Sequence, residues 1–169
     1  TFLTTYSSLP SFFEQCRKRV TEPRWISSPF QRYRRFPYTT DFQVLGELER
    51  QAQNFPIQSA VADIVNQCLH NLYWYRTDHD RPDLYKICLQ IHDAVLLEVP
   101  VKHLKEVVEK VIPACSSSIP LYRCDLSGNR VQGAKPFYLA SDVDIYEYYG
   151  QKMTDEDKAR LGVPAELSA

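Results

Sequence analysis

The chain has 169 residues, of which 44% are hydrophobic and 12% aromatic, and its formal net charge is −1 at pH 7. This composition is typical of a globular domain and excludes an intrinsically disordered chain, and no stretch is apolar for long enough to predict a membrane span. The five cysteines are an odd number without a Cys-x-x-Cys pair, which disfavours disulfides and a zinc site and favours reduced core thiols.

The two ends of the sequence differ in charge. Residues 1–40 hold seven Lys and Arg against two acids, whereas residues 141–169 hold three against seven. This pattern fits one surface that faces a polyanion, although a merely solvated basic face explains it equally well. The first residues lack the regions of a signal peptide, so we expect an intracellular protein, cytoplasmic in a bacterial or phage-infected cell.

The first predicted elements are a short helix and a hairpin. Apolar residues at helical spacing predict an amphipathic helix over 11–20, which Pro23 ends. Trp25-Ile26 and residues 33–36 predict two paired strands, because the Ser27-Ser28-Pro29 segment between them favours a turn.

A long helix is predicted over 41–75. We expect Pro56 to kink or break it, because proline removes a backbone donor. After Pro56 the apolar residues keep helical spacing, which predicts a well-buried half. A polar loop over 77–82 follows.

Two apolar, β-branched runs, 86–91 and 95–99, predict a β-hairpin around His92-Asp93-Ala94. Pro100 ends this hairpin.

An amphipathic helix is predicted over 101–112, with a Glu106–Lys110 pair at i,i+4 and Pro113 as its stop. Residues 119–124 and 137–140 are further strand candidates. Thr154 is expected to cap a last short helix. The order of elements predicts an α+β fold.

His92 and Asp93 form the first candidate site. A tight turn can hold Asp93 rigid and exposed, as a Mg²⁺ ligand requires, since magnesium takes few protein carboxylates together with substrate phosphates. Asp is also a common turn residue, and spacing alone favours that interpretation.

Arg50, Asn54 and Gln58 form the second. They fall at i, i+4 and i+8, so they share roughly one helix face, subject to the kink expected at Pro56. Such long donors suit minor-groove acceptors, which every base pair presents. A solvated polar stripe is the ordinary alternative.

Together these segments resemble the family A DNA polymerases. Residues 90–96, Gln-Ile-His-Asp-Ala-Val-Leu, are similar to the third conserved motif of the family, a hairpin that carries His-Asp-Glu. Residues 49–63, from Glu-Arg through Asn-Phe-Pro-Ile-Gln to Ala-Asp, resemble the helix before it. Residues 31–37, Gln-Arg-Tyr-Arg-Arg-Phe-Pro, resemble the Gly-Arg-Arg-Arg stretch that follows the fingers. The resemblance covers about 5–124, and residues 144–150 and the tail suggest phage-type members.

The resemblance implies the C-terminal part of a right-hand polymerase palm, with an antiparallel β-hairpin and flanking helices, plus the end of the fingers. Residues 1–40 are then the end of the fingers and a connecting hairpin. Residues 41–140 are the palm, with its DNA-contacting helix and metal-site hairpin. Residues 141–169 are an acidic C-terminal tail.

The resemblance also implies a metal site. Asp93 corresponds to the second of two palm carboxylates that hold a catalytic Mg²⁺ pair, and His92 to a contact of the primer end. The site is shared with a missing chain, since the first palm motif has no match. The usual Glu after the Asp is Ala94 here, which we expect to tune activity rather than abolish it.

DNA contacts are implied at six further positions. Arg50, Asn54 and Gln58 correspond to residues that bond primer and template in the minor groove. Arg32, Arg34 and Arg35 would lie near the template–primer backbone, which is the loosest of these transfers. Ser59 stands where the family has Gly.

The expected protein is therefore a DNA polymerase that is inactive alone. Its partners would be an N-terminal polymerase chain carrying the first palm motif and the fingers, primer–template DNA and dNTP, with no membrane. Thr1 suits release by protein splicing, and an artificial boundary would look the same. The alternative is a non-catalytic nucleic-acid-binding or assembly module derived from a polymerase. A His-Asp metal phosphohydrolase is disfavoured, because His92-Asp93 lies between strands.

Overall fold

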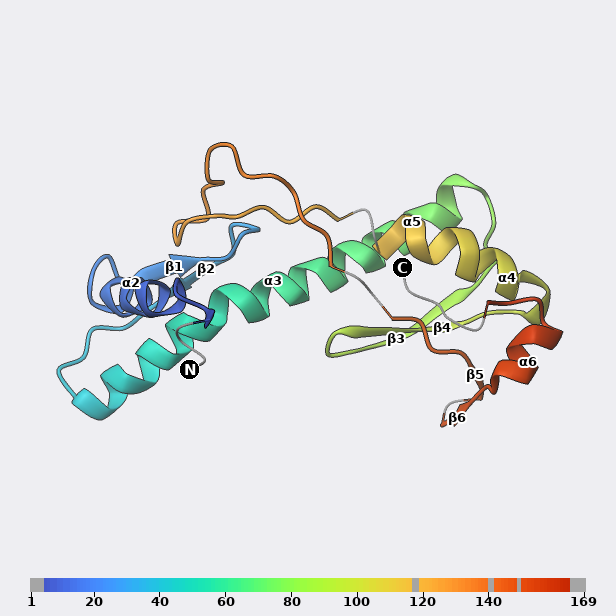
Figure 1. The fold of residues 1–169 in the computed structure, drawn as a ribbon, viewed down its shortest axis with the longest axis horizontal. Coiled ribbons are helices and arrows are strands. Elements are labelled where there is room, and N and C mark those ends of the chain that lie inside the picture. Colours follow the sequence, from blue (N-terminus) through green and yellow to red (C-terminus); the bar gives the residue numbers. More distant parts are fainter. Residues whose placement is uncertain (1–4, 117–118, 140–141, 149, 165–169) are drawn as a thin grey trace. The chain divides into compact units, whose positions relative to one another are not determined.

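The computed structural model describes residues 5–116, 119–139, 142–148 and 150–164. The chain divides into two compact units, unit 1 with residues 1–63 and 121–136 and unit 2 with residues 64–120 and 137–169 (Figure 1). The fold is α+β as predicted, and the strands described form three two-stranded antiparallel sheets. No helix in the described part of the chain has the length and apolar character needed to cross a membrane.

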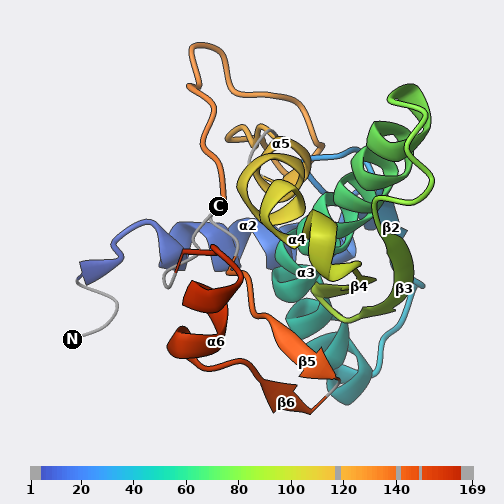
Figure 2. The ribbon, with the colours of Figure 1, turned by 90° about the vertical axis from the view of Figure 1, so that its right-hand side faces the viewer.

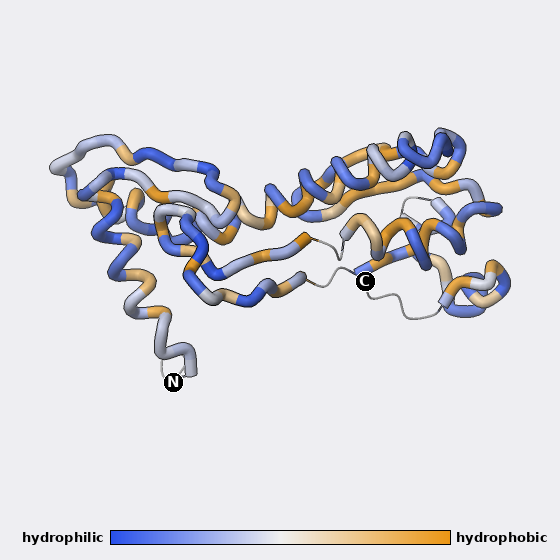
Figure 3. Tube along the Cα trace, turned by 90° about the horizontal axis from the view of Figure 1, so that it is seen from above, coloured by the Kyte–Doolittle hydropathy of each residue, from blue (hydrophilic) through white to orange (hydrophobic). Residues whose placement is uncertain are grey.

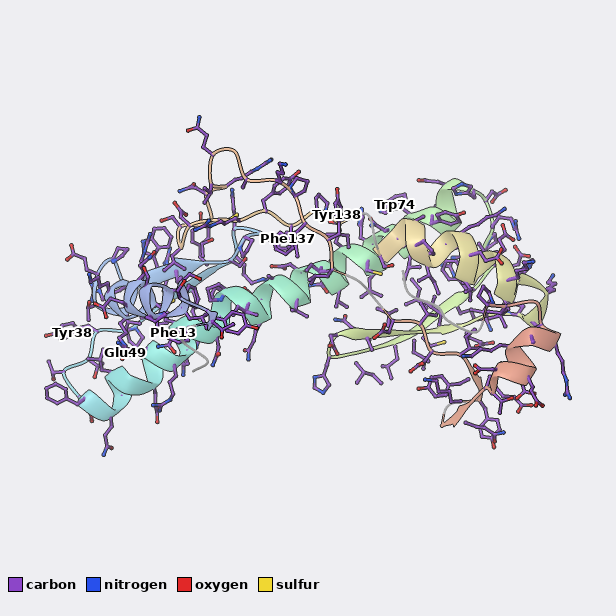
Figure 4. All side chains as sticks on the ribbon, in the orientation of Figure 1. Phe13, Tyr38, Glu49, Trp74, Phe137 and Tyr138 are labelled. Carbon is purple, nitrogen blue, oxygen red and sulfur yellow. The ribbon has the colours of Figure 1, made fainter. Side chains whose placement is uncertain are left out.

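Unit 1 begins with the predicted helix and hairpin. They are α2 (Leu9–Thr21), β1 (Trp25–Ser27) and β2 (Tyr33–Arg35), and the first part of α3 (Phe42–Asp78) follows. The helix starts two residues earlier than predicted, because Pro10 in its first turn removes no intrahelical hydrogen bond. Glu49 of α3, labelled in Figure 4, lies 3.6 Å from Arg17 of α2.

The core of unit 1 joins α2, the hairpin and α3. Its buried members are Cys16, Val20, Ile26, Phe36, Leu48 and Ala52. Hydrophobic and hydrophilic residues alternate along the helices (Figure 3), as expected where one helix face packs on a core. Burial of this kind fixes the rotation of α3 about its own axis.

Residues 121–136, here named the return loop, dock onto β1. The Ser27 amide donates to the Leu126 carbonyl at 3.0 Å, and Arg19 donates to the Ser127 hydroxyl at 2.6 Å. Leu126 packs against the core of unit 1. Figure 1 shows the loop, in orange, beside β1 and β2.

Neither strand predicted in this part of the chain is present in the residues described. In place of the strand over 119–124, Leu121 and Cys124 are isolated bridge residues, and Cys124 pairs with Arg130. Phe137 is also an isolated bridge residue, and residue 140 lies outside the described residues.

The predicted break at Pro56 is wrong, because α3 continues as one helix of 37 residues. Proline removes a single hydrogen bond, here to the Ala52 carbonyl. Pro56 itself is buried, as are Ala52 one turn before it and Leu48 two turns before it. Most helical stability in proteins comes from such packing, which outweighs the local loss.

Unit 2 contains the rest of α3 and the predicted hairpin. Its elements are β3 (Lys86–Ile91), β4 (Ala94–Glu98), η1 (Val101–His103), α4 (Leu104–Glu106), η2 (Val107–Val111), α5 (Ile112–Ser116), β5 (Tyr146–Tyr148), β6 (Gln151–Lys152) and α6 (Asp155–Arg160). Its main core cluster consists of Leu72, Leu84, Tyr85, Val107, Val111 and Cys115. Figure 2 shows β5, β6 and α6 together.

The predicted stop at Pro113 is also wrong, since helix continues to Ser116. A π-helical turn, η2, ends two residues before Pro113. The proline ring would clash with the carbonyl four residues back, that of Glu109, and the wider π turn relaxes this regular spacing. In the residues described, Glu106 pairs with Arg81 at 3.6 Å and not with Lys110 as predicted.

The predicted cap of the last helix is confirmed. The Asp157 amide donates to the Thr154 hydroxyl at 3.2 Å, and the Thr154 amide donates to the Asp157 carboxylate at 3.2 Å. This reciprocal pair is a capping box.

All five cysteines are free, as predicted. Burial raises the pKa of Cys16 to about 11 and that of Cys115 to about 12, so both thiols stay protonated. The prediction of core thiols is wrong for Cys88, which is exposed on β3.

The contact between the return loop and β1 predicts a strong effect of substitution at Gly128. Gly128 has a φ of +81°, and an added Cβ would lie 2.6 Å from the Ser27 hydroxyl and 3.0 Å from the Ser28 carbonyl. We expect Gly128→Ala to lower the free energy of unfolding in urea by about 2–4 kcal/mol, from left-handed strain and overpacking together.

Gly133→Ala is the matched control. Gly133 has a φ of +76°, but nothing lies within 4 Å of an added Cβ. Gly133→Ala should therefore lower the free energy of unfolding by only about 1 kcal/mol, which is the cost of the left-handed backbone alone. Equal losses in the two variants would contradict the close packing of the loop.

Ser59 predicts a stabilising substitution. Its hydroxyl is buried and has no hydrogen-bond partner among the described residues. Ser59→Ala should raise the unfolding free energy by about 1 kcal/mol or more, because it removes an unsatisfied hydroxyl and improves helix propensity. Asn66→Ala on the exposed surface of the same helix should gain only about 0.5 kcal/mol, from propensity. A gain at Ser59 no larger than that at Asn66 would contradict the prediction.

Candidate nucleic-acid interface

The β3–β4 hairpin places His92 and Asp93 in a two-residue turn. Ile91 pairs with Ala94, so Ala94 belongs to the strand and not to the tip. His92 has a φ of 53°, in the left-handed region that a two-residue hairpin turn uses and in which His is enriched. Asp93 is exposed. The turn therefore places the exposed Asp93 carboxylate at the tip of the hairpin.

The two faces of this hairpin differ. Ile87, Val95 and Leu97 pack against the main core of unit 2. Leu89 and Ile91 are instead 51% and 38% exposed. The register shifts between Ile87 and Leu89, so Cys88 is an extra residue on β3. The result is an apolar, solvent-exposed strand face beside the turn.

The described residues contain no group of three or more His, Cys, Asp or Glu side chains that could hold a metal. Asp93 can supply one carboxylate ligand. Magnesium commonly takes only one or two protein carboxylates and fills its remaining positions with water and phosphate oxygens. An exposed Asp93 in a two-residue turn thus fits one part of such a shell.

Arg50, Asn54 and Gln58 all lie on the exposed side of α3. We name these three residues the α3 stripe. Because α3 continues through Pro56, they share one face, and the buried Leu48, Ala52 and Ser59 occupy the opposite one. The stripe presents a guanidinium and two carboxamides, all of which can donate hydrogen bonds. Ile57 beside it is 61% exposed.

The three arginines of 32–35 have different surroundings. Arg32 forms an ion pair with Asp63, whose hydrogen bond and charge raise the pKa of the guanidinium. Arg34 donates to the Gln51 side-chain oxygen at 2.6 Å and lies 6.0 Å from the ring of Phe55.

Arg35 is exposed, and within the residues described no ion pair involves it. Of the three, it is the guanidinium most available to a phosphate. Arg32 and Arg34 connect the hairpin to α3.

The candidate residues fall into two sets. The α3 stripe and the three arginines belong to unit 1, whereas His92 and Asp93 belong to unit 2. The formal charges of the units are opposite. Unit 1 holds 11 Lys and Arg against seven Asp and Glu, or +4, and unit 2 holds nine against 14, or −5.

Sequence reasoning missed the basic residues of the return loop, Arg123, Arg130 and Lys135. Their neighbours 125–129, Asp-Leu-Ser-Gly-Asn, are a turn signal that conflicts with a strand over 119–124. No local pattern, however, predicts that this turn packs on β1, about a hundred residues earlier in the chain.

The sequence model of DNA polymerase family A matches residues 1–126. Similar proteins include DNA polymerase I of Lactococcus lactis subsp. cremoris, 28% identical over 123 residues that make up 72% of this chain and 14% of that protein. DNA polymerase I of Caldicellulosiruptor bescii is 32% identical over 113 residues, 66% of this chain and 13% of that protein. DNA polymerase I A, chloroplastic/mitochondrial, of Arabidopsis thaliana is 28% identical over 113 residues, 62% and 10% respectively.

The chain thus spans a seventh or less of the length of these curated relatives. The matched segment contains the β3–β4 hairpin, the α3 stripe and the β1–β2 hairpin. The predicted resemblance is confirmed, and the chain belongs to DNA polymerase family A.

Proposed function

We propose that this chain is the C-terminal part of a template-directed DNA polymerase, which transfers a nucleotide from dNTP to the 3′-hydroxyl of a primer. The observation that carries the proposal is the exposed Asp93 in the two-residue turn of β3–β4, within the family match. In this proposal residues 1–40 end the fingers, 41–140 belong to the palm and 141–169 form an acidic tail. An intracellular, phage-type setting belongs to the same proposal.

Asp93 is proposed as a carboxylate ligand of the catalytic Mg²⁺ pair. When bound, two such ions stabilise the attacking 3′-oxygen and the leaving pyrophosphate of an in-line displacement. The contribution of the chain is to hold the carboxylate in place before DNA binds. His92, beside it in the turn, would contact the primer end.

The α3 stripe is proposed to bind primer and template in the minor groove. Its donors would meet the A N3 and T O2 acceptors, and their equivalents on G·C pairs, without reading sequence. Arg35 is proposed to contact the phosphate backbone. Contacts by Arg32 and Arg34 remain part of the proposal, although their present partners are protein groups.

The first palm motif and the dNTP-binding fingers would come from a partner chain. The exposed apolar face of β3 at Leu89 and Ile91 supports such a partner, because solvent-exposed apolar strands favour covering by another segment.

A non-catalytic binding module is the second candidate. It is favoured by Ala94, which stands where the family has Glu, and by the single carboxylate at the turn. In this case DNA would still bind through unit 1, but no synthesis would depend on Asp93.

The first test is primer extension on a DNA template with Mg²⁺ and all four dNTPs. We compare this chain, its co-purified partner, and the two together. Extension should require both chains, and Asp93→Asn should lower its rate by at least about a hundredfold, because it removes electrostatic stabilisation in the transition state.

Glu98→Gln is the matched control. It removes one carboxylate from the opposite end of the same hairpin, where Glu98 pairs with Lys86 at 3.2 Å, and should leave the rate unchanged. Extension that is indifferent to Asp93, or absent with both chains present, would contradict the catalytic proposal and favour the binding module.

A second test concerns the α3 stripe. The triple variant Arg50→Ala/Asn54→Ala/Gln58→Ala should weaken binding of a primer–template duplex at least tenfold, because it removes donors to the minor groove and one cation. Circular dichroism should show an intact helix, since all three residues are exposed. Affinity should fall equally on A·T-rich and G·C-rich duplexes. Unchanged affinity would remove the DNA-contacting role from this face.

A further inference from the structure

The return loop carries a cluster of basic residues outside the α3 stripe. Arg123, Arg130 and Lys135 are all exposed, and Asp125 is its single acid. The family match ends at residue 126, so most of the loop lies beyond it.

The acid of the loop is hydrogen-bonded within its own turn and keeps its negative charge. The amides of Ser127 and Asn129 donate to Asp125 at 2.8 and 2.9 Å, and the Asn129 side chain donates to it at 3.2 Å. Burial raises the pKa of Asp125, but these hydrogen bonds outweigh it and keep the pKa below its usual value. The carboxylate is thus occupied by the turn, and within the residues described none of the three cations forms an ion pair with it.

The cations themselves are held on an ordered backbone. The Val131 amide donates to the Arg123 carbonyl at 2.8 Å, which closes the stem of the turn. Arg130 lies 3.5 Å from the ring centroid of Tyr122 and donates to the Ala134 carbonyl at 2.8 Å. Leu126 packs against the core of unit 1, and Gly128 lies close to Ser27 and Ser28. Little backbone ordering would therefore oppose binding of a ligand at this turn.

Ion pairing differs between the two units. Among the described residues of unit 1, three of the 11 cations contact a carboxylate, namely Arg17, Lys18 and Arg32. In unit 2 seven of nine do so, namely Arg81, Lys86, Lys102, Lys105, Lys152, Lys158 and Arg160. Cations without acidic partners thus concentrate in unit 1, where a polyanion can replace the missing counter-charge.

We infer that the return loop is a second nucleic-acid contact, which binds the phosphodiester backbone through Arg123, Arg130 and Lys135. This inference rests on the proposed function. The loop packs through Leu126 on the core that includes Leu48 and Ala52, the buried face of α3, whereas the α3 stripe lies on the opposite face. The loop therefore adds contacts that the stripe does not make. Backbone contacts carry no sequence information, so this surface would bind DNA of any sequence.

The test is the salt dependence of DNA binding by the full chain. Arg123→Gln/Lys135→Gln removes two exposed cations and leaves the stacked Arg130 in place. Labelled duplex and labelled single-stranded oligonucleotides form the two arms. On the strand type that the loop binds, the slope of log K against log salt should decrease by roughly 0.9 per lost contact for duplex and roughly 0.7 for single strands. Affinity at about 100 mM salt should fall at least tenfold.

Lys102→Gln/Lys105→Gln in unit 2 is the charge-matched control, because both side chains are well exposed. It should leave slope and affinity unchanged. The inference would be overturned if the loop variant had the salt slope and affinity of the wild type. It would also be overturned if the control variant lost as much affinity as the loop variant.

The α3 stripe variant, measured in the same assay, separates the two proposals. If only the stripe variant loses DNA affinity, the proposed function stands and the loop is not a DNA contact. If only the loop variant loses DNA affinity, this inference stands and the α3 stripe is not a minor-groove contact. No measurable binding of either oligonucleotide by the full chain would overturn both.

Discussion

Burial of one face of α3 determines which residues of unit 1 can meet a ligand. Ala52 is fully buried and Leu48 nearly so, and this fixes the rotation of the helix. With 3.6 residues per turn, Arg50, Asn54 and Gln58 must then face outward. The same constraint lets Arg34 reach Gln51 and Phe55 along the edge of the buried face. The stripe is thus a consequence of the core, and it persists because the core also carries α3 through Pro56.

Local patterns predicted the elements of this fold better than their ends. The hairpin tip at His92 and Asp93 was predictable, because two β-branched runs leave only a short turn between them. The break expected at Pro56 and the stop expected at Pro113 were wrong, since tertiary packing at Pro56 and a π turn before Pro113 compensate a loss that local propensity overstates. The contact of Gly128 with β1 is long-range, and no periodicity in the sequence encodes it.

In the candidate site too, local patterns predict which residues are exposed but not their long-range partners. An exposed carboxylate at position 93 follows from the turn alone, and its exposure agrees with the prediction. The sequence predicts one role for Arg32, Arg34 and Arg35, yet the structure gives them different partners. Arg32 pairs with Asp63, 31 residues away, and Arg34 with Gln51, 17 residues away. Partners at such separations depend on how β2 packs on α3, which the sequence does not reveal residue by residue.

In the proposed function, the opposite charges of the two units constrain how this chain would hold DNA. Unit 2 carries −5, and its cations are mostly neutralised by neighbouring carboxylates, so it repels a phosphate backbone over the range that salt leaves unscreened. Asp93 adds to that repulsion. In the proposed function, attraction would therefore come from unit 1, where most of the described cations lack a carboxylate partner. The residues proposed to bind DNA and the residue proposed for catalysis therefore lie in electrostatically distinct surroundings, because the first belong to a unit of charge +4 and the second to a unit of charge −5.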